Sequence, residues 1–185
     1  MSIVAKSTIA FATMVIIGII ISIIIIKVCN SNGKFKTDYD ERQKLMIGKS
    51  YKCAMMTAWA LMAVYAVIDM GGVVLPIQNA VIVFTILIIS VMVQAMYSVW
   101  ADAYWGSNNK YGSYIVMFII ITLINLSAAV ASVMDGSMIV DGILTGRVIN
   151  FECALVFMIL GIEMWVKKIV DKKANVAEED DDEES

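Results

Sequence analysis

The chain has 185 residues, of which 60% are hydrophobic, and its mean hydropathy is +0.80. This composition excludes an ordinary water-soluble domain, because the apolar residues form uninterrupted blocks close to the ~20 residues that a helix needs to cross a bilayer. The formal net charge of −3 is misleading, since seven consecutive acids, Glu178 to Glu184, produce it. The segments between the apolar blocks are basic.

The first predicted transmembrane span covers residues 8–26 and leads into a basic segment, residues 27–52. Seven of the 14 Lys and Arg residues lie in this segment, and such a density of positive charge is typical of the cytoplasmic side. Asp38, followed three residues later by Glu41, predicts the start of a helix that continues into the membrane. Cations of this helix are expected to contact lipid phosphates at the inner surface: Arg42, Lys44, Lys49 and Lys52.

The second span is predicted over residues 53–68 and is rich in alanine, which favours close helix contacts. Two glycines and the single proline, within residues 71–76, end it. The third span is predicted over residues 80–99. A polar loop rich in Trp and Tyr follows it, residues 100–111, and this composition is typical of a membrane interface.

The fourth span is predicted over residues 114–133 and the fifth over residues 151–166. Between them, residues 135–150 hold Asp141-Gly142 flanked by short apolar runs, which indicates a hairpin with a type I′ turn. We expect this hairpin to lie outside the cell. Residues 173–185 form an acidic tail, which the run of like charges predicts to be disordered.

The fold class predicted from these elements is all-α, an integral membrane helical bundle of five spans within residues 1–172. With residues 27–52 inside, twelve Lys and Arg residues fall on the inner side, and Lys6 and Arg147 fall on the outer side. The positive-inside rule therefore predicts an N-terminus outside and a C-terminus inside.

Polar residues within the predicted spans are the candidates for a functional site. Glu152 and Glu163 are eleven residues apart, close to three helical turns, so both project from one face. Intramembrane carboxylates indicate proton or cation passage; alternatively, Glu152 marks the outer start of the helix and Glu163 pairs with Lys167. Gln94 and Asn125 lie near the middle of their spans, where they would line a binding site or form an interhelical hydrogen bond.

The residue inventory argues against catalysis and metal binding. The chain has no histidine, the commonest general base and metal ligand, and no nucleophile is spaced to meet a base across facing spans. The three cysteines and 14 methionines are scattered without a repeated spacing. We expect no catalytic residue, no cofactor, no metal site and no nucleic-acid partner.

Three groups of residues carry a resemblance to a known family and cover most of the chain from position 39 onward. The groups are Tyr39-Asp40-Glu41-Arg42-Gln43 with Gly48-Lys49 and Tyr51-Lys52, then Trp100-Ala101-Asp102-Ala103-Tyr104, and Asp141-Gly142-Ile143-Leu144-Thr145-Gly146-Arg147 with Asn150. Through these groups the chain resembles a family of small, uncharacterised multi-pass membrane proteins of Clostridia-like bacteria. The resemblance implies a bacterial plasma-membrane protein and no particular activity.

The sequence favours a non-enzymatic accessory or regulatory protein of the membrane. Its partners would be the lipid bilayer and either another membrane protein or further copies of itself. The alternative is a small oligomeric transporter or channel-like subunit that uses Glu152 and Glu163. An intramembrane enzyme ranks third, because it would need a nucleophile and a base inside the bundle.

Overall fold

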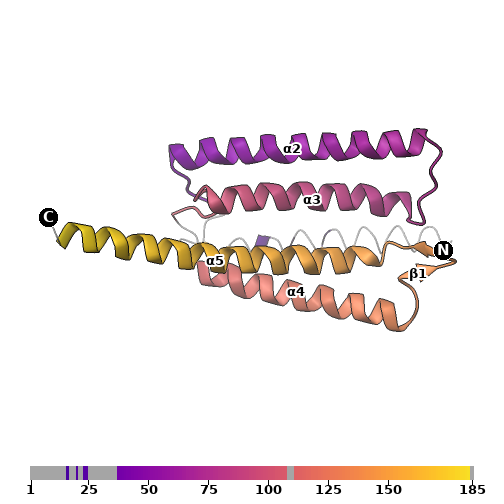
Figure 1. Ribbon diagram of the computed structural model, residues 1–185. Helices are drawn as coiled ribbons and strands as arrows, with labels where there is room; N and C mark the ends of the chain where they lie inside the picture. Colours follow the sequence, from indigo (N-terminus) through magenta and orange to yellow (C-terminus); the bar gives the residue numbers. More distant parts are fainter. Residues whose placement is uncertain (1–15, 17–19, 21–22, 25–36, 108–110, 184–185) are drawn as a thin grey trace.

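The computed structural model describes residues 16, 20, 23–24, 37–107 and 111–183. Four helices, labelled α2 to α5, and one short hairpin, β1–β2, make up this described part (Figure 1). Most of the predicted span at residues 8–26, and the basic segment up to residue 36, lie outside the described residues.

Helix α2 runs from Glu41 to Met70 and contains the whole predicted span at residues 53–68. It begins at a capping box, in which the Asp40 side chain accepts from the Gln43 backbone N–H (2.6 Å) and the Gln43 side chain accepts from the Asp40 N–H (3.2 Å). The prediction of a start at Asp38 is therefore wrong by two residues. The Asp38 carbonyl instead accepts a hydrogen bond from the Ser107 N–H.

Helices α3, from Asn79 to Trp100, and α4, from Tyr111 to Met134, coincide closely with the predicted apolar runs. The turns that end them use the left-handed backbone region. Asp102 after α3 has a φ of 53°, and Gly136 after α4 has a φ of 71°. Such angles suit Gly and the short polar side chains of Asp and Asn.

The segment between α4 and α5 forms the predicted hairpin. Strand β1, Ile139–Val140, pairs antiparallel with β2, Ile143–Leu144. Asp141 and Gly142 both have positive φ, 53° and 74°, as a type I′ turn requires. The Asp-Gly prediction is confirmed.

Helix α5 runs from Val148 to Glu183 and extends beyond both ends of the predicted span at residues 151–166. The backbone of residues 173–183, which the charge run predicts to be disordered, is helical in the structure. Residues 171–183 contain no Gly or Pro, and seven of these thirteen residues are Lys, Ala or Glu. Adding such residues to an existing helix is favourable, because the costly nucleation step is already complete.

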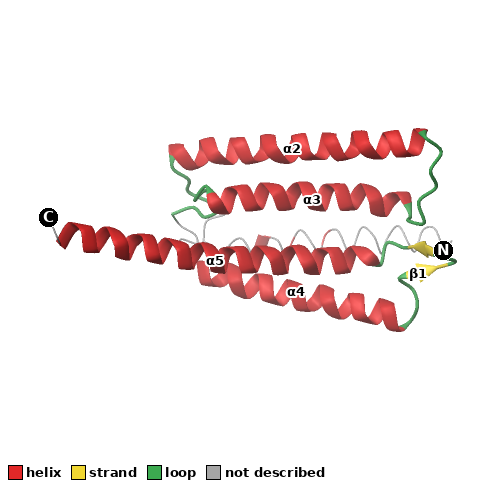
Figure 2. Ribbon diagram, viewed as in Figure 1, coloured by secondary structure: helices red, strands yellow, loops and turns green. Residues whose placement is uncertain are grey.

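The described helices lie side by side in the order α2, α3, α5, α4, so α5 separates the two helices that precede it in the chain (Figure 1). Neighbouring helices run in nearly opposite or parallel directions, and the loops gather at the two ends (Figure 2). One end holds the start of α2, the α3–α4 loop and the later half of α5. The other end holds the α2–α3 loop and the hairpin.

The tightest apolar packing lies near the end where α2 begins. Val99 of α3, Phe118 of α4 and Met164 of α5 form a buried cluster. The rings of Phe118 and Phe157 pack at a centroid distance of 5.5 Å. This cluster joins α3, α4 and α5 into one unit.

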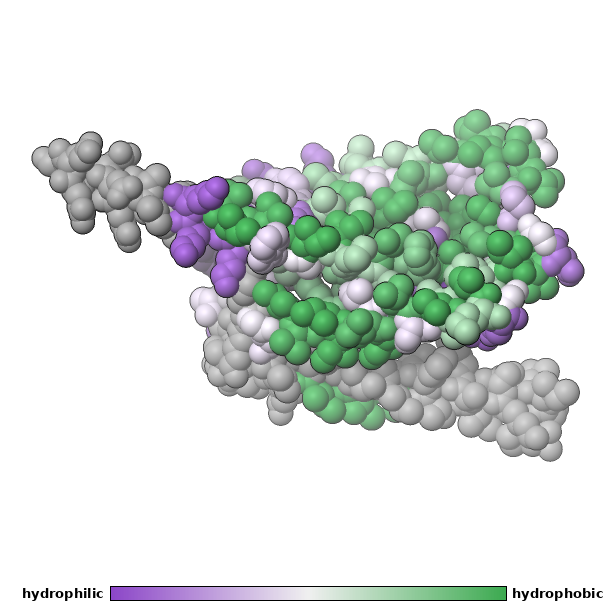
Figure 3. Space-filling model, turned by 60° about the horizontal axis from the view of Figure 1, so that its bottom comes forward, coloured by the Kyte–Doolittle hydropathy of each residue, from purple (hydrophilic) through white to green (hydrophobic). Residues whose placement is uncertain are grey.

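Most of the remaining apolar surface faces outward. Helices α2, α3 and, from Gly112, α4 are long and apolar enough to cross a membrane, and none of the apolar window of α2 is buried. Figure 3 shows hydrophobic residues over the middle of the described surface and hydrophilic ones toward its ends. Such a broad exposed apolar surface is typical of a protein that contacts lipid.

Candidate functional site

The first polar feature is the contact between α3 and α5 that contains Glu152. Its Oε1 atom lies 2.7 Å from the Thr85 hydroxyl of α3, which also lies 2.9 Å from the Val81 carbonyl. The Oε2 atom of Glu152 is buried and has no hydrogen-bond partner among the described residues. Sequence reasoning found the glutamate and missed Thr85, because helix pairing cannot be read from apolar runs.

Glu163 lies three turns further along α5 and is only 8% exposed. It sits close to Trp100, at the end of α3, yet neither carboxylate oxygen has a hydrogen-bond partner among the described residues. Both glutamates thus lie against α3, as their spacing on one face suggests. We call this region, defined by Thr85, Trp100, Glu152 and Glu163, the α3–α5 seam.

The ion pair between Glu163 and Lys167 that the spacing suggests is not formed. Lys167 instead contacts Asp102 of the α3–α4 loop at 2.9 Å and Asp171 on α5 at 2.5 Å. Asp171 and Asp102 both raise the pKa of the Lys167 ammonium above its ordinary value. Glu163 is therefore left without a counter-charge from its own helix.

The two candidate amides, Gln94 and Asn125, do not join the seam. Asn125 donates its side-chain N–H to the Ile121 carbonyl of its own helix at 2.9 Å. Gln94 on α3 is half-buried, and no hydrogen bond links it to another described residue. The structure brings neither amide into contact with Glu152 or Glu163.

The cations expected to meet lipid phosphates are exposed on the first three turns of α2. Arg42, Lys49 and Lys52 share a face, because seven and ten residues are close to two and three turns. Lys44 points elsewhere and pairs with Glu41 at 2.6 Å. Three of the four side chains could therefore meet one membrane surface together.

A second polar region, which sequence reasoning missed, joins the start of α2 to the α3–α4 loop. The side-chain N–H₂ of Gln43 donates to the carbonyls of Asp102 and Trp105, both at 2.9 Å. The Ser107 N–H donates to the Asp38 carbonyl at 2.9 Å. We call this region, residues 37–43 and 101–107 with Lys167, the polar junction.

The polar junction is closely packed and has aromatic walls. A Cβ atom on Gly106 would lie 2.3 Å from Thr37 Cγ2 and 2.5 Å from the Asp38 carbonyl oxygen. Trp105 stacks edge-on against both Tyr104 and Tyr114, at centroid distances of 4.7 and 4.6 Å. An open groove of about 420 Å³ runs between the two segments. The sequence signals were the Asp40/Gln43 capping pair and a glycine inside an aromatic loop.

Burial changes the acidity of two tyrosines in the polar junction. It raises the pKa of Tyr104 to about 12 and also raises the pKa of Tyr39. Both hydroxyls therefore stay protonated across the physiological range. The Tyr39 hydroxyl donates to the Tyr104 backbone carbonyl at 3.5 Å, so the Tyr39 side chain links the two segments.

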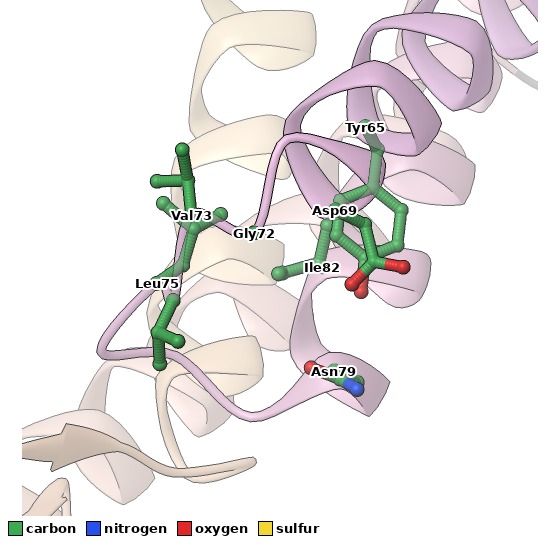
Figure 4. Close-up of a pocket in the computed structure, with 8 residues that line it drawn as sticks. Tyr65, Asp69, Gly72, Val73, Leu75, Asn79 and Ile82 are labelled. Carbon is green, nitrogen blue, oxygen red and sulfur yellow. The ribbon is translucent and has the colours of Figure 1, made fainter.

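A smaller pocket of about 270 Å³ lies at the opposite end, between the end of α2 and the start of α3. Figure 4 shows Tyr65 and Asp69 of α2 above Asn79 and Ile82 of α3, with the Gly72–Leu75 loop beside them. The pocket is open and contains one carboxylate. A single carboxylate is too little charge to bind an ion firmly.

Metal ligands are not gathered anywhere in the part of the chain that the structure describes. Within these residues no group of three His, Cys, Asp or Glu side chains could hold a metal ion, and Cys53 and Cys153 are both free thiols.

The family models, the curated proteins and the solved structures contain no match to this chain. The resemblance to the small clostridial membrane proteins therefore stays a prediction, and functional inference depends on the residues themselves.

Proposed function

We propose that the protein is a multi-pass protein of the plasma membrane with its N-terminus outside and its C-terminus inside. In this topology five segments cross the membrane: α2, α3, α4, residues 8–26, and residues 151–166 of α5. The distribution of charge supports this orientation. Lys44, Lys49, Lys167 and Lys168 lie toward the end where α2 begins, whereas Arg147 lies at the hairpin end.

Within the membrane, we propose that the protein acts as a non-enzymatic accessory subunit that uses α2 as its docking helix. The observation that carries this proposal is that no residue in the apolar window of α2 is fully buried. Among the described helices α2 packs against α3 alone. Its opposite face presents Met56, Ala60, Ala63 and Val67, all exposed, and small residues between larger ones allow a partner helix to approach closely.

A photo-crosslinking scan along α2 tests this role. A photoreactive residue placed at Met56, Ala60 or Ala63 should form an adduct with a protein, either another membrane protein or a second copy. The same residue at Leu61, which is half-buried on the side of α3, is the matched control and should give no such adduct. Adducts with lipid alone at all three outer positions would contradict the accessory role.

The seam supports a second candidate function, a small oligomeric transporter or channel-like subunit. The supporting observation is that three carboxylate oxygens, one on Glu152 and two on Glu163, are buried without partners among the described residues. Unpaired acids inside a membrane are typical of proton and cation pathways. A single row of described helices encloses no pathway, so this function would require several copies.

Flux into proteoliposomes tests the second candidate. A proton or cation flux that Glu163→Gln abolishes would support transport. Asp141→Asn removes the same charge from the exposed hairpin turn, where Asn also tolerates positive φ, and should leave the flux unchanged. A flux that both variants leave intact, or no flux from the wild type at any pH gradient, would contradict transport.

A further inference from the structure

The hydrogen bonds around Thr85 raise the question of where one proton lies. The Thr85 hydroxyl is 2.7 Å from Glu152 Oε1 and 2.9 Å from the Val81 carbonyl oxygen. A threonine hydroxyl has a single proton, so a well-aligned hydrogen bond to one acceptor weakens its bond to the other. If Glu152 carries a proton, its O–H donates to Thr85 and Thr85 donates to Val81. Both short contacts are then hydrogen bonds.

The second oxygen of Glu152 also favours the protonated form. Oε2 is buried and has no partner among the described residues. In an ionised carboxylate, this atom would hold about half of a negative charge in an apolar contact. In a protonated carboxyl it is a neutral carbonyl oxygen, and burying a neutral acceptor costs far less than burying a charge.

Among the described residues, the helices packed against this part of α5 are α3 and α4, and they supply no positive charge. Their described titratable side chains are tyrosines near the far end, Tyr97 on α3 and Tyr114 on α4. On α5 itself, Cys153 is the neighbouring titratable group. Arg147 precedes α5 but forms no ion pair with Glu152. Its charge acts on Asp135, whose pKa is lowered first by hydrogen bonds with Ser137 and to a lesser extent by Arg147.

The helix dipole does not replace a counter-charge. Glu152 is the fifth residue of α5, which begins at Val148. The favourable effect of a helix N-terminus on a carboxylate falls off within the first turn. Glu152 therefore lies beyond the positions where the dipole stabilises an anion strongly.

Glu163 stands in a comparable position on the same face. It is only 8% exposed, and neither oxygen has a partner among the described residues. The nearest cation along its helix, Lys167, is held by Asp102 and Asp171. A carboxylate buried to this degree without a partner would be among the costliest groups in the protein.

We propose that the α3–α5 seam is a proton-binding site, in which Glu152 and Glu163 each carry a proton and Glu152 donates it to Thr85. This inference goes beyond the accessory role and holds whether or not the protein transports anything. The ligand is a proton and not a metal cation, because one proton on Glu152 completes the contacts of Thr85.

Labelling with dicyclohexylcarbodiimide in proteoliposomes at pH 7 tests the proposal. This apolar reagent reacts with protonated carboxyls: the O–H adds across a C=N bond, and the acyl group shifts to nitrogen without a leaving group. An ordinary glutamate is protonated in roughly one molecule in 500 at pH 7. Glu152 and Glu163 should therefore be modified at least roughly ten-fold more, per site, than the tail acids, as peptide mass spectrometry measures.

Replacing each glutamate by glutamine shows which residue carries each adduct. Glu152→Gln should remove the adduct on its own peptide and leave that on Glu163, and Glu163→Gln should do the reverse. Equal labelling of the seam and the tail would overturn the proposal. Protection of Glu152 by Na⁺ at constant pH would also overturn it, because the site would then hold a metal cation.

Infrared spectroscopy gives an independent reading of Thr85. The C=O stretch of a protonated carboxylic acid is well separated from carboxylate bands, and Glu152→Gln should remove one such band. Thr85→Val, which keeps the shape and removes the hydroxyl, should shift that band to higher frequency. If no protonated carboxyl band responds to either variant, Glu152 is ionised and the proposal fails. Neither test depends on flux or on crosslinking, so its failure would leave the proposed functions standing.

Discussion

Polar side chains of the polar junction have hydrogen-bond or ion-pair partners, whereas most carboxylate oxygens of the α3–α5 seam have none among the described residues. In the junction, the Gln43 amide donates to two loop carbonyls, and Lys167 has two carboxylate partners. In the seam, three of the four oxygens of Glu152 and Glu163 have no partner among the described residues. The contrast agrees with the proposed topology, in which the junction lies in water, where charges are paired and hydrated, and the seam lies in hydrocarbon, where acids are neutral.

The largest expected effect comes from breaking the packing of the junction. In Gly106→Ala, the new methyl group would overlap Thr37 and the Asp38 carbonyl. We expect a loss of about 2–3 kcal/mol in the free energy of unfolding, measured by SDS titration in mixed micelles. Gly48→Ala on α2 is the control: it has open space around it and should stabilise by about 0.5–1 kcal/mol. An equal change in the free energy of unfolding in both variants would show that Gly106 is not packed closely against Thr37 and Asp38.

The next effect separates the two tasks of Gln43. Gln43→Ala removes the Gln43 half of the capping box and the amide donor to the loop, and should cost about 1–2 kcal/mol. Gln43→Glu keeps an acceptor for the cap but cannot donate to the loop carbonyls, so it should cost about half as much. The same SDS titration measures both. An unchanged stability in Gln43→Ala would mean that water replaces these bonds at no cost.

A smaller effect is expected from the ion pairs of Lys167. Since Asp171 and Asp102 raise its pKa, their contribution is fully present below the ordinary lysine pKa and is lost as pH rises through the raised value. Lys167→Met should cost about 0.5–1 kcal/mol at pH 7, because the two carboxylates are half exposed. The stability of the wild type should fall toward that of the variant above the lysine pKa. A constant difference at high pH would contradict the pairing.

The smallest effect is expected in the seam. Glutamine has nearly the shape of a protonated glutamate, and its amide can donate to Thr85. Glu152→Gln should therefore stay within about 0.5 kcal/mol of the wild type. A loss as large as that of Gln43→Ala would show that the seam needs the carboxylate charge.

Local signals in the sequence predicted the elements well. Apolar runs predicted the positions of α3 and α4, and Asp141-Gly142 predicted the hairpin turn. The sequence did not predict the helical continuation of α5 to Glu183. In this segment, repulsion between like charges opposes a helix, whereas the helix propensity of the residues favours one. The prediction of disorder considered the charges alone and was wrong.

Contacts between distant segments could not be predicted from local signals. Residue spacing suggested Glu163 as the partner of Lys167, but Asp102, 65 positions earlier in the sequence, is one of its actual partners. Apolar helices look alike in composition, so nothing indicated that α5 would pack between α3 and α4 or that Thr85 would meet Glu152. The sequence identified Glu152 and Glu163 as candidates, but only the fold shows which side chains surround them.

The depth of the α3–α5 seam and of the polar junction in the bilayer is the most direct test of this contrast. Spin labels in liposomes measure it. A nitroxide at Leu155, between the two glutamates on α5, should collide with membrane-soluble oxygen and not with a water-soluble nickel complex. A nitroxide at Ser107 in the polar junction should show the reverse. Strong collisions between the nickel complex and the label at Leu155 would place the seam in water and contradict the account.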